Sequence, residues 1–218
     1  MKLLFSLFFI CFNCVLMAQE IKTISAVQAK DIDFFSYDDY DEKMNPIGEV
    51  EFLRGCNWYC GGFVKSITAS SELEEYNGIT YSPSNVHDFN KNTAWVEGSS
   101  GDGIGEYIIY HFDFSEVDNY DGSMGINRIL IANGYKKTLK DWKNNSRIKQ
   151  LKVYLNDELF AVLNLLDSFE IQTVEIDEIM FPANEITQLK FEISAIYDGD
   201  KYTDTALSLL MFDGVGVH

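Results

Sequence analysis

The chain has 218 residues, 46% of them hydrophobic, with 17 basic and 34 acidic side chains and a formal net charge of −17. This apolar content is enough for a core, and the length fits one domain. Because nucleic acids and anionic membrane surfaces are bound through lysine and arginine patches, the charge argues against both as partners.

The first residues form an apolar run behind Lys2, and the run ends at Ala18 before a polar stretch. This pattern predicts a secretory signal peptide over residues 1–18, cleaved near Ala18. The run is too short for a good membrane-spanning helix. No long apolar segment follows it, so we expect an exported protein, secreted, periplasmic or on the cell surface, without membrane insertion.

Residues 19–50 form an acidic N-terminal segment whose role the sequence leaves open. Its dense run, 31–42, is more typical of a solvated loop or arm than of a cation site. Beyond this segment lie Cys56 and Cys60, the two cysteines outside the signal peptide. In an oxidising compartment we expect them to form a local disulfide, which fixes the shape of the turn that carries Trp58.

From residue 63 onward, β-rich or alternating runs recur between turn signals. In one of them, Leu189, Phe191 and Ile193 alternate with polar residues, as expected for a strand with one buried face. Many short strands without a long amphipathic helix predict an all-β fold, an antiparallel β-sandwich over residues 51–218. The predicted strands are 63–70, 106–113, 126–132, 147–155, 159–165, 171–176, 188–196 and 206–212.

Four glycines between residues 98 and 105 raise the question of a phosphate-binding loop. Such a loop needs a helix behind it, whereas the following residues, 107–113, are β-branched and aromatic and predict a strand. A nucleophile elbow at 122–125 is also unsupported, because Asp121 stands where its first glycine should be. We therefore predict no enzyme activity; a hydrolase with carboxylates hidden in the acidic loops is the rival hypothesis.

Several stretches, in order along the chain, together resemble one family. They are 55–62, 68–71, 85–98, 101–106, 133–137, 145–149 and 201–208. Over about residues 53–213 the chain resembles the discoidin, or coagulation factor 5/8 type C, superfamily, and most closely its NADase-type glycan-binding branch. The resemblance implies a galactose-binding-like jelly-roll β-sandwich of an exported bacterial protein that binds carbohydrate without altering it. A protein-interaction or adhesion module on the same fold is the alternative.

The resemblance also implies a calcium site. Many discoidin-like sugar binders hold a calcium ion between their loops, and Asp88, Asn90 and Thr93 could supply oxygen ligands here. The chain departs from the family at Leu209, which replaces a late glutamate. Loss of that carboxylate should weaken calcium binding.

A carbohydrate site needs an aromatic face for the C–H side of the sugar ring and polar groups for its hydroxyls. The segment 133–145 offers both. In the alternative reading, Asn133 and Gly134 only form a turn, Tyr135 packs at the rim, and Asn145 and Arg147 orient the loop. Trp95 is expected mainly in the core. The residues expected to bind glycan are Asn133, Tyr135, Lys137, Trp142, Trp58 and Glu97.

Overall fold

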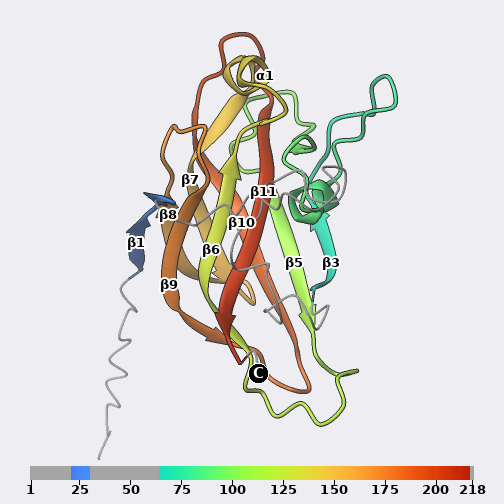
Figure 1. Cartoon of the computed structure of the whole chain (residues 1–218), viewed down its shortest axis with the longest axis vertical. Helices are drawn as coiled ribbons and strands as arrows, with labels where there is room; N and C mark the ends of the chain where they lie inside the picture. The colour runs from blue at the N-terminus through green and yellow to red at the C-terminus, as the bar shows by residue number, and fades with distance from the viewer. Residues whose placement is uncertain (1–20, 30–63, 217–218) are drawn as a thin grey trace, which may run out of the picture.

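The computed structural model describes residues 21–29 and 64–216, which form a β-sandwich with one short α-helix (Figure 1). All eight strands expected from the sequence are confirmed, and β1, β2, β4 and α1 are added to them. The elements are β1 (Lys22–Ser25), β2 (Val27–Gln28), β3 (Val64–Ala69), a 3-10 helix η3 (Pro83–His87), β4 (Trp95–Val96), β5 (Tyr107–Asp113), β6 (Gly125–Asn133), α1 (Leu139–Asn144), β7 (Ser146–Leu155), β8 (Glu158–Asn164), β9 (Gln172–Met180), β10 (Ile186–Tyr197) and β11 (Thr205–Val215).

The strands are hydrogen-bonded in the order β2-β9-β6-β11-β7-β10-β5-β3, with β1 on β8, β8 on β7 and β4 on β11. Most pairs are antiparallel, as expected. Two are not: β1 runs parallel to β8, and β7 meets β11 in a parallel contact of two residue pairs. The sheet is therefore mixed, with antiparallel pairing everywhere among the described strands except at these two contacts. The short β7–β11 contact joins the two halves of the sandwich.

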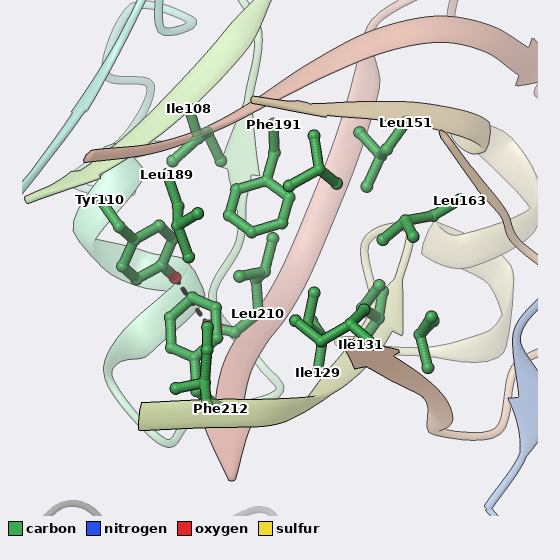
Figure 2. Packing of buried hydrophobic residues seen from close by; sticks show 14 of the residues in the cluster. Ile108, Tyr110, Ile129, Ile131, Leu151, Leu163, Leu189, Phe191, Leu210 and Phe212 are labelled. Atoms are coloured by element: carbon green, nitrogen blue, oxygen red, sulfur yellow. Dashed lines mark hydrogen bonds between the residues drawn. The ribbon is translucent and has the colours of Figure 1, made fainter. Parts of the chain in front are cut away.

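The core lies between the two halves, and Figure 2 shows its central side chains. Strand β10 alternates buried and partly exposed residues, which is the period-two pattern read from its sequence. From β5, Tyr110 packs against Phe212 of β11 with ring centroids 4.8 Å apart at 87°. The buried Tyr110 hydroxyl donates a 2.6 Å hydrogen bond to the carbonyl of Leu210. This bond satisfies the one polar group that the ring brings into the core.

A segment N-terminal to the family resemblance connects the two halves at their open side. Residues 22–28, which we call the strap, place β1 on the edge of β8 and β2 on the edge of β9. Between them, Ala26 is buried in the main core, and its N–H donates to the carbonyl of Asn164 at 2.8 Å. Part of the segment whose role the sequence left open thus pairs with both halves of the sandwich.

Several sequence-based predictions concern residues outside the described ranges. They are the signal peptide, the acidic run 31–42, the Cys56–Cys60 disulfide and Trp58. Within the ranges described, no helix has the length and apolar character needed to cross a membrane.

Candidate functional site

Helix α1 and the turn between β10 and β11 lie at one end of the sandwich (Figure 1). A pocket of about 520 Å³ is lined by residues of α1, of the loop before β11 and of neighbouring segments. This volume is within the range typical of small-ligand sites. Four segments line it: the hairpin 72–81, strand β4, residues 135–145 and the loop before β11. The lining residues are Leu73, Glu74, Glu75, Tyr76, Ile79, Tyr81, Val96, Tyr135, Lys137, Asp141, Asn145, Tyr202 and Asp204.

The hairpin 72–81, which we call the finger, forms one wall of the pocket. Tyr76 and Ile79 exchange two main-chain hydrogen bonds of 3.1 and 3.0 Å, and the two residues between them, Asn77 and Gly78, have φ values of +52° and +77°. This is the geometry of a two-residue hairpin turn, for which Asn-Gly is the favoured sequence. Tyr76 is 68% exposed at its tip. The finger therefore presents an aromatic ring to solvent beside the pocket.

Two tyrosines and two aliphatic side chains form the inner part of the pocket. The rings of Tyr81 and Tyr135 lie edge to face, with centroids 6.4 Å apart at 81°, against the small apolar cluster that includes Leu73 and Val96. Burial raises the pKa of both phenols, and the charge of Asp141 raises it further. Both hydroxyls are therefore neutral at physiological pH and able to donate or accept a hydrogen bond.

Tyr135 is held in place by a turn that depends on Gly134. Gly134 has φ of +82°, and a Cβ there would lie 2.7 Å from Cδ1 of Trp142. Glycine is thus required both for the backbone conformation and for the close approach of the indole. Asn133 is fully buried, donates to the carbonyl of Ile148 at 2.6 Å and accepts from its N–H at 2.9 Å. These contacts fix the direction in which the chain leaves β6.

Trp142 packs beneath the same turn. Its Nε1–H donates to the carbonyl of Asn133 at 2.9 Å, and the guanidinium of Arg147 lies 4.5 Å from the ring centroid. Phe169 meets the ring edge to face at 5.8 Å. Arg147 in turn pairs with Asp167 and donates to the carbonyl of Asn145 at 2.9 Å. The indole is enclosed by protein and stabilises the loop, as does Arg147.

Glu97 organises the glycine-rich loop. It is fully buried, and its carboxylate accepts from the N–H groups of Ser99 at 2.8 Å and Thr205 at 3.1 Å. Gly103 lies directly over it, so that a Cβ there would come 2.7 Å from the Glu97 Cγ. The loop that follows β4 thus wraps around a carboxylate, and β5 follows it as expected. Trp95, just before Glu97, is 1% exposed, which confirms its core role.

Of the six residues expected to bind glycan, two line the pocket: Tyr135 and Lys137. Asn133, Trp142 and Glu97 are buried and bonded within the protein, so they do not line it, and Trp58 lies outside the described residues. The sequence reasoning missed Tyr76, Tyr81 and Tyr202. Only the finger had a local signal, the Asn-Gly pair of its turn.

The expected calcium ligands fit such an ion poorly. Both carboxylate oxygens of Asp88 accept hydrogen bonds, one from the N–H of Asn90 at 2.9 Å and the other from the hydroxyl of Thr93 at 2.7 Å. The same hydroxyl lies 2.6 Å from the carbonyl oxygen of Asn90, so its single hydrogen is shared between these two acceptors. Leu209, in place of the family's glutamate, belongs to a small apolar cluster against which Phe89 packs. One carboxylate whose oxygens are already bonded falls short of the six to eight oxygen ligands that calcium takes.

Comparisons with known proteins place this geometry in a family. Residues 58–213 match the family model described as NAD glycohydrolase translocation F5/8 type C domain. No curated protein matches the chain.

Solved structures agree on the fold. A structure of the CBM32-1, CBM32-2 and M60 catalytic domains of Clostridium perfringens ZmpB is similar with a TM-score of 0.54 at 14% identity, over 91% of this chain and 17% of that one. The CBM32-1 and CBM32-2 domains of the same protein in complex with GalNAc give 0.52 at 14% identity, over 91% and 41%. The chain therefore spans less than half the length of these proteins, and the likeness concerns the β-sandwich. Because the family match covers more than half of the sequence, the chain belongs to the NAD glycohydrolase translocation type of F5/8 type C, discoidin-like, domains.

Proposed function

We propose that this domain binds a glycan, without altering it, in the pocket between the finger and α1. The observation that carries the proposal is the pair of tyrosines, Tyr81 and Tyr135, set edge to face inside a pocket that polar side chains surround. A sugar ring has an apolar C–H face and a hydroxyl edge. It therefore needs an aromatic surface and hydrogen-bonding groups close together.

The pocket supplies both kinds of group from separate segments. The ring of Tyr135, partly exposed, offers a face for stacking. Lys137 donates hydrogen bonds to sugar oxygens, and the carboxylates of Asp141 and Asp204 accept them from hydroxyls. Because the Tyr135 turn is already fixed by the buried Asn133 contacts, little conformational entropy is lost on binding.

A purely binding role is part of the proposal. The family is that of a non-catalytic F5/8 type C domain. The pocket does carry carboxylates, the groups that a glycosidase would use as acid and nucleophile, and we propose that they bind sugar hydroxyls instead. A screen with chromogenic glycosides tests this point, and hydrolysis would contradict it. We also propose that the protein is exported, on the strength of the N-terminal residues 1–18.

A glycan array with the purified protein is the first experiment, and GalNAc is a suitable single probe because a structure of the same fold was solved with it. Titration of the best glycan should then show about a tenfold loss of affinity in Tyr135→Ala, the value of one good aromatic contact. Tyr135→Phe should retain most of the affinity. Tyr154→Ala is a matched control, since Tyr154 lies near the far end of β7 beneath Lys190.

Unchanged affinity in Tyr135→Ala would show that the glycan binds elsewhere. A blank array would contradict the glycan proposal and favour a protein partner on the same fold. In that case the exposed apolar side chains of Tyr76, Ile79 and Tyr202 would be the first surface to test.

A further inference from the structure

The charge around the pocket is unbalanced. Four carboxylates line it, and they come from three separate segments: Glu74 and Glu75 from the finger, Asp141 from α1 and Asp204 from the loop before β11. Lys137 is the one cation among the described lining residues. Within the described ranges, none of the four carboxylates takes part in an ion pair.

A second lysine lies at the rim of the pocket, but the net charge around the pocket stays negative. The ammonium of Lys201 donates to the hydroxyl of Tyr202 at 2.7 Å, and Tyr202 lines the pocket. Four negative charges against two positive ones leave the mouth with an excess of two negative charges. Burial raises the pKa of Tyr81 and Tyr135, and the charge of Asp141 raises it further, so this one carboxylate lies close enough to act on both inner tyrosines.

Building on the proposed function, we infer that the pocket selects glycans without acidic groups. It accepts neutral sugars, binds sugars with a free amine more tightly, and rejects glycans that carry a carboxylate or a sulfate ester. The carboxylates alone would not indicate a ligand; the tyrosine-lined pocket that they surround does. Two net charges at about 8 Å in water correspond to about a fivefold change in affinity at low salt. The effect should shrink as added salt shortens the screening length.

The test uses related probes on the same sugar scaffold that carry a positive, a neutral or a negative group. On the array, each neutral glycan is compared with its sialylated or sulfated counterpart. In solution, the methyl glycosides of galactose, galactosamine and galacturonic acid are titrated against the full chain at about 0.01 M and about 1 M NaCl. We expect affinity to fall in the order amine, neutral, acid at low salt, and the three values to converge at high salt.

Variants of the finger and of Lys137 should change the ratio of acid to neutral glycan affinity in opposite directions. Glu74→Gln with Glu75→Gln should reduce the discrimination against the acid about fivefold, whereas Lys137→Gln should increase it. The control pair, Glu178→Gln with Glu185→Gln, changes the net charge of the protein equally. Both control residues are exposed and lie at or near the turn between β9 and β10, outside the pocket. The readout is the ratio of acid to neutral affinity within each variant, which a general loss of stability would not alter.

The outcomes separate this inference from the proposed function. If acidic and neutral glycans bind equally and without salt dependence, the charge selection is wrong although the glycan site stands. If the finger variant and its control change the ratio equally, the selection comes from net charge rather than from the pocket, and the assignment to these residues is wrong. If no glycan binds at any salt concentration, the proposed function fails and this inference falls with it.

Discussion

Replacement of Trp142 distinguishes a residue that supports the proposed glycan site from one that would contact the glycan. The indole is 9% exposed and lies outside the pocket lining, with its Nε1–H bonded to the Asn133 carbonyl at 2.9 Å. If these contacts describe its role, Trp142→Phe should lower the stability of the protein. The folded fraction should still bind glycan with nearly the original affinity.

The magnitude follows from what each substitution removes. In Trp142→Phe an aromatic ring remains, but the buried Asn133 carbonyl loses its partner, which costs about 1–3 kcal/mol. Trp142→Ala also removes the ring beneath Arg147 and leaves a cavity. Truncation of a buried tryptophan lowers the free energy of unfolding by about 3–5 kcal/mol. The lost cation–π contact with Arg147 accounts for about 1–2 kcal/mol of that loss. The alanine variant should therefore be clearly less stable than the phenylalanine variant.

Urea unfolding followed by circular dichroism measures both losses, with the slope of the transition checked for constancy between variants. Glycan affinity is then measured well below the transition, where each variant is folded. The reasoning would be refuted if Trp142→Phe kept the stability of the original protein but lost glycan affinity tenfold. That result would make Trp142 a ligand contact, as its residue type alone first suggested.

Three further outcomes are expected. Ala26→Asp should destabilise the protein by several kcal/mol in urea unfolding, because the new carboxylate would be buried between the strap and the core. Val27→Asp is the control: this position is 59% exposed, and the substitution should change stability by about 0.5 kcal/mol or less. Burial lowers the pKa of Lys136 from 10.5 to about 8. Between these pH values the unfolded chain binds more protons than the folded protein, so the free energy of unfolding should rise with pH from about 8 to 10.5. Urea unfolding at several pH values measures this rise, which Lys136→Met should lack. EDTA should leave the melting temperature unchanged, because the Asp88 loop is closed by its own hydrogen bonds; a fall on EDTA addition, reversed by calcium, would restore the metal site.

Strand prediction succeeded where the signal was local. The alternation in 188–196 corresponds to the buried and partly exposed faces of β10. Asn156 and Asp157, read as a turn, have φ values of +47° and +69° and join β7 to β8. Both features depend on neighbours only a few residues apart. The strap was not predicted, because β1 and β2 depend on pairing with strands more than a hundred residues away.

The sequence did not indicate which side chains of the segment 133–145 point toward the pocket. Trp142 and Asn133 were selected because their types suit a sugar, but the turn at Gly134 directs both into protein contacts. Their hydrogen-bond partners, the Asn133 and Ile148 main chains, could not be read from composition. Tyr135 and Lys137, from the same segment, do line the pocket. The segment therefore contributes both to the pocket lining and to the buried contacts beneath it, and residue type alone did not indicate which residue does which.

Buried contacts hold the loops around the pocket in a defined arrangement. Arg147 connects the Tyr135 turn to Asp167 through a bidentate pair of 2.7 and 3.2 Å, and it reaches the carbonyl of Asp198 at 3.2 Å. The segment 135–145 and the loop before β11, both of which contribute to the pocket lining, are thus bonded to one buried guanidinium. Since this ordering is complete before a ligand arrives, binding energy need not be spent on fixing the loops. The same reasoning predicts that disruption of the Arg147–Asp167 pair would weaken glycan binding indirectly, by loosening Tyr135 and the Tyr202 loop together.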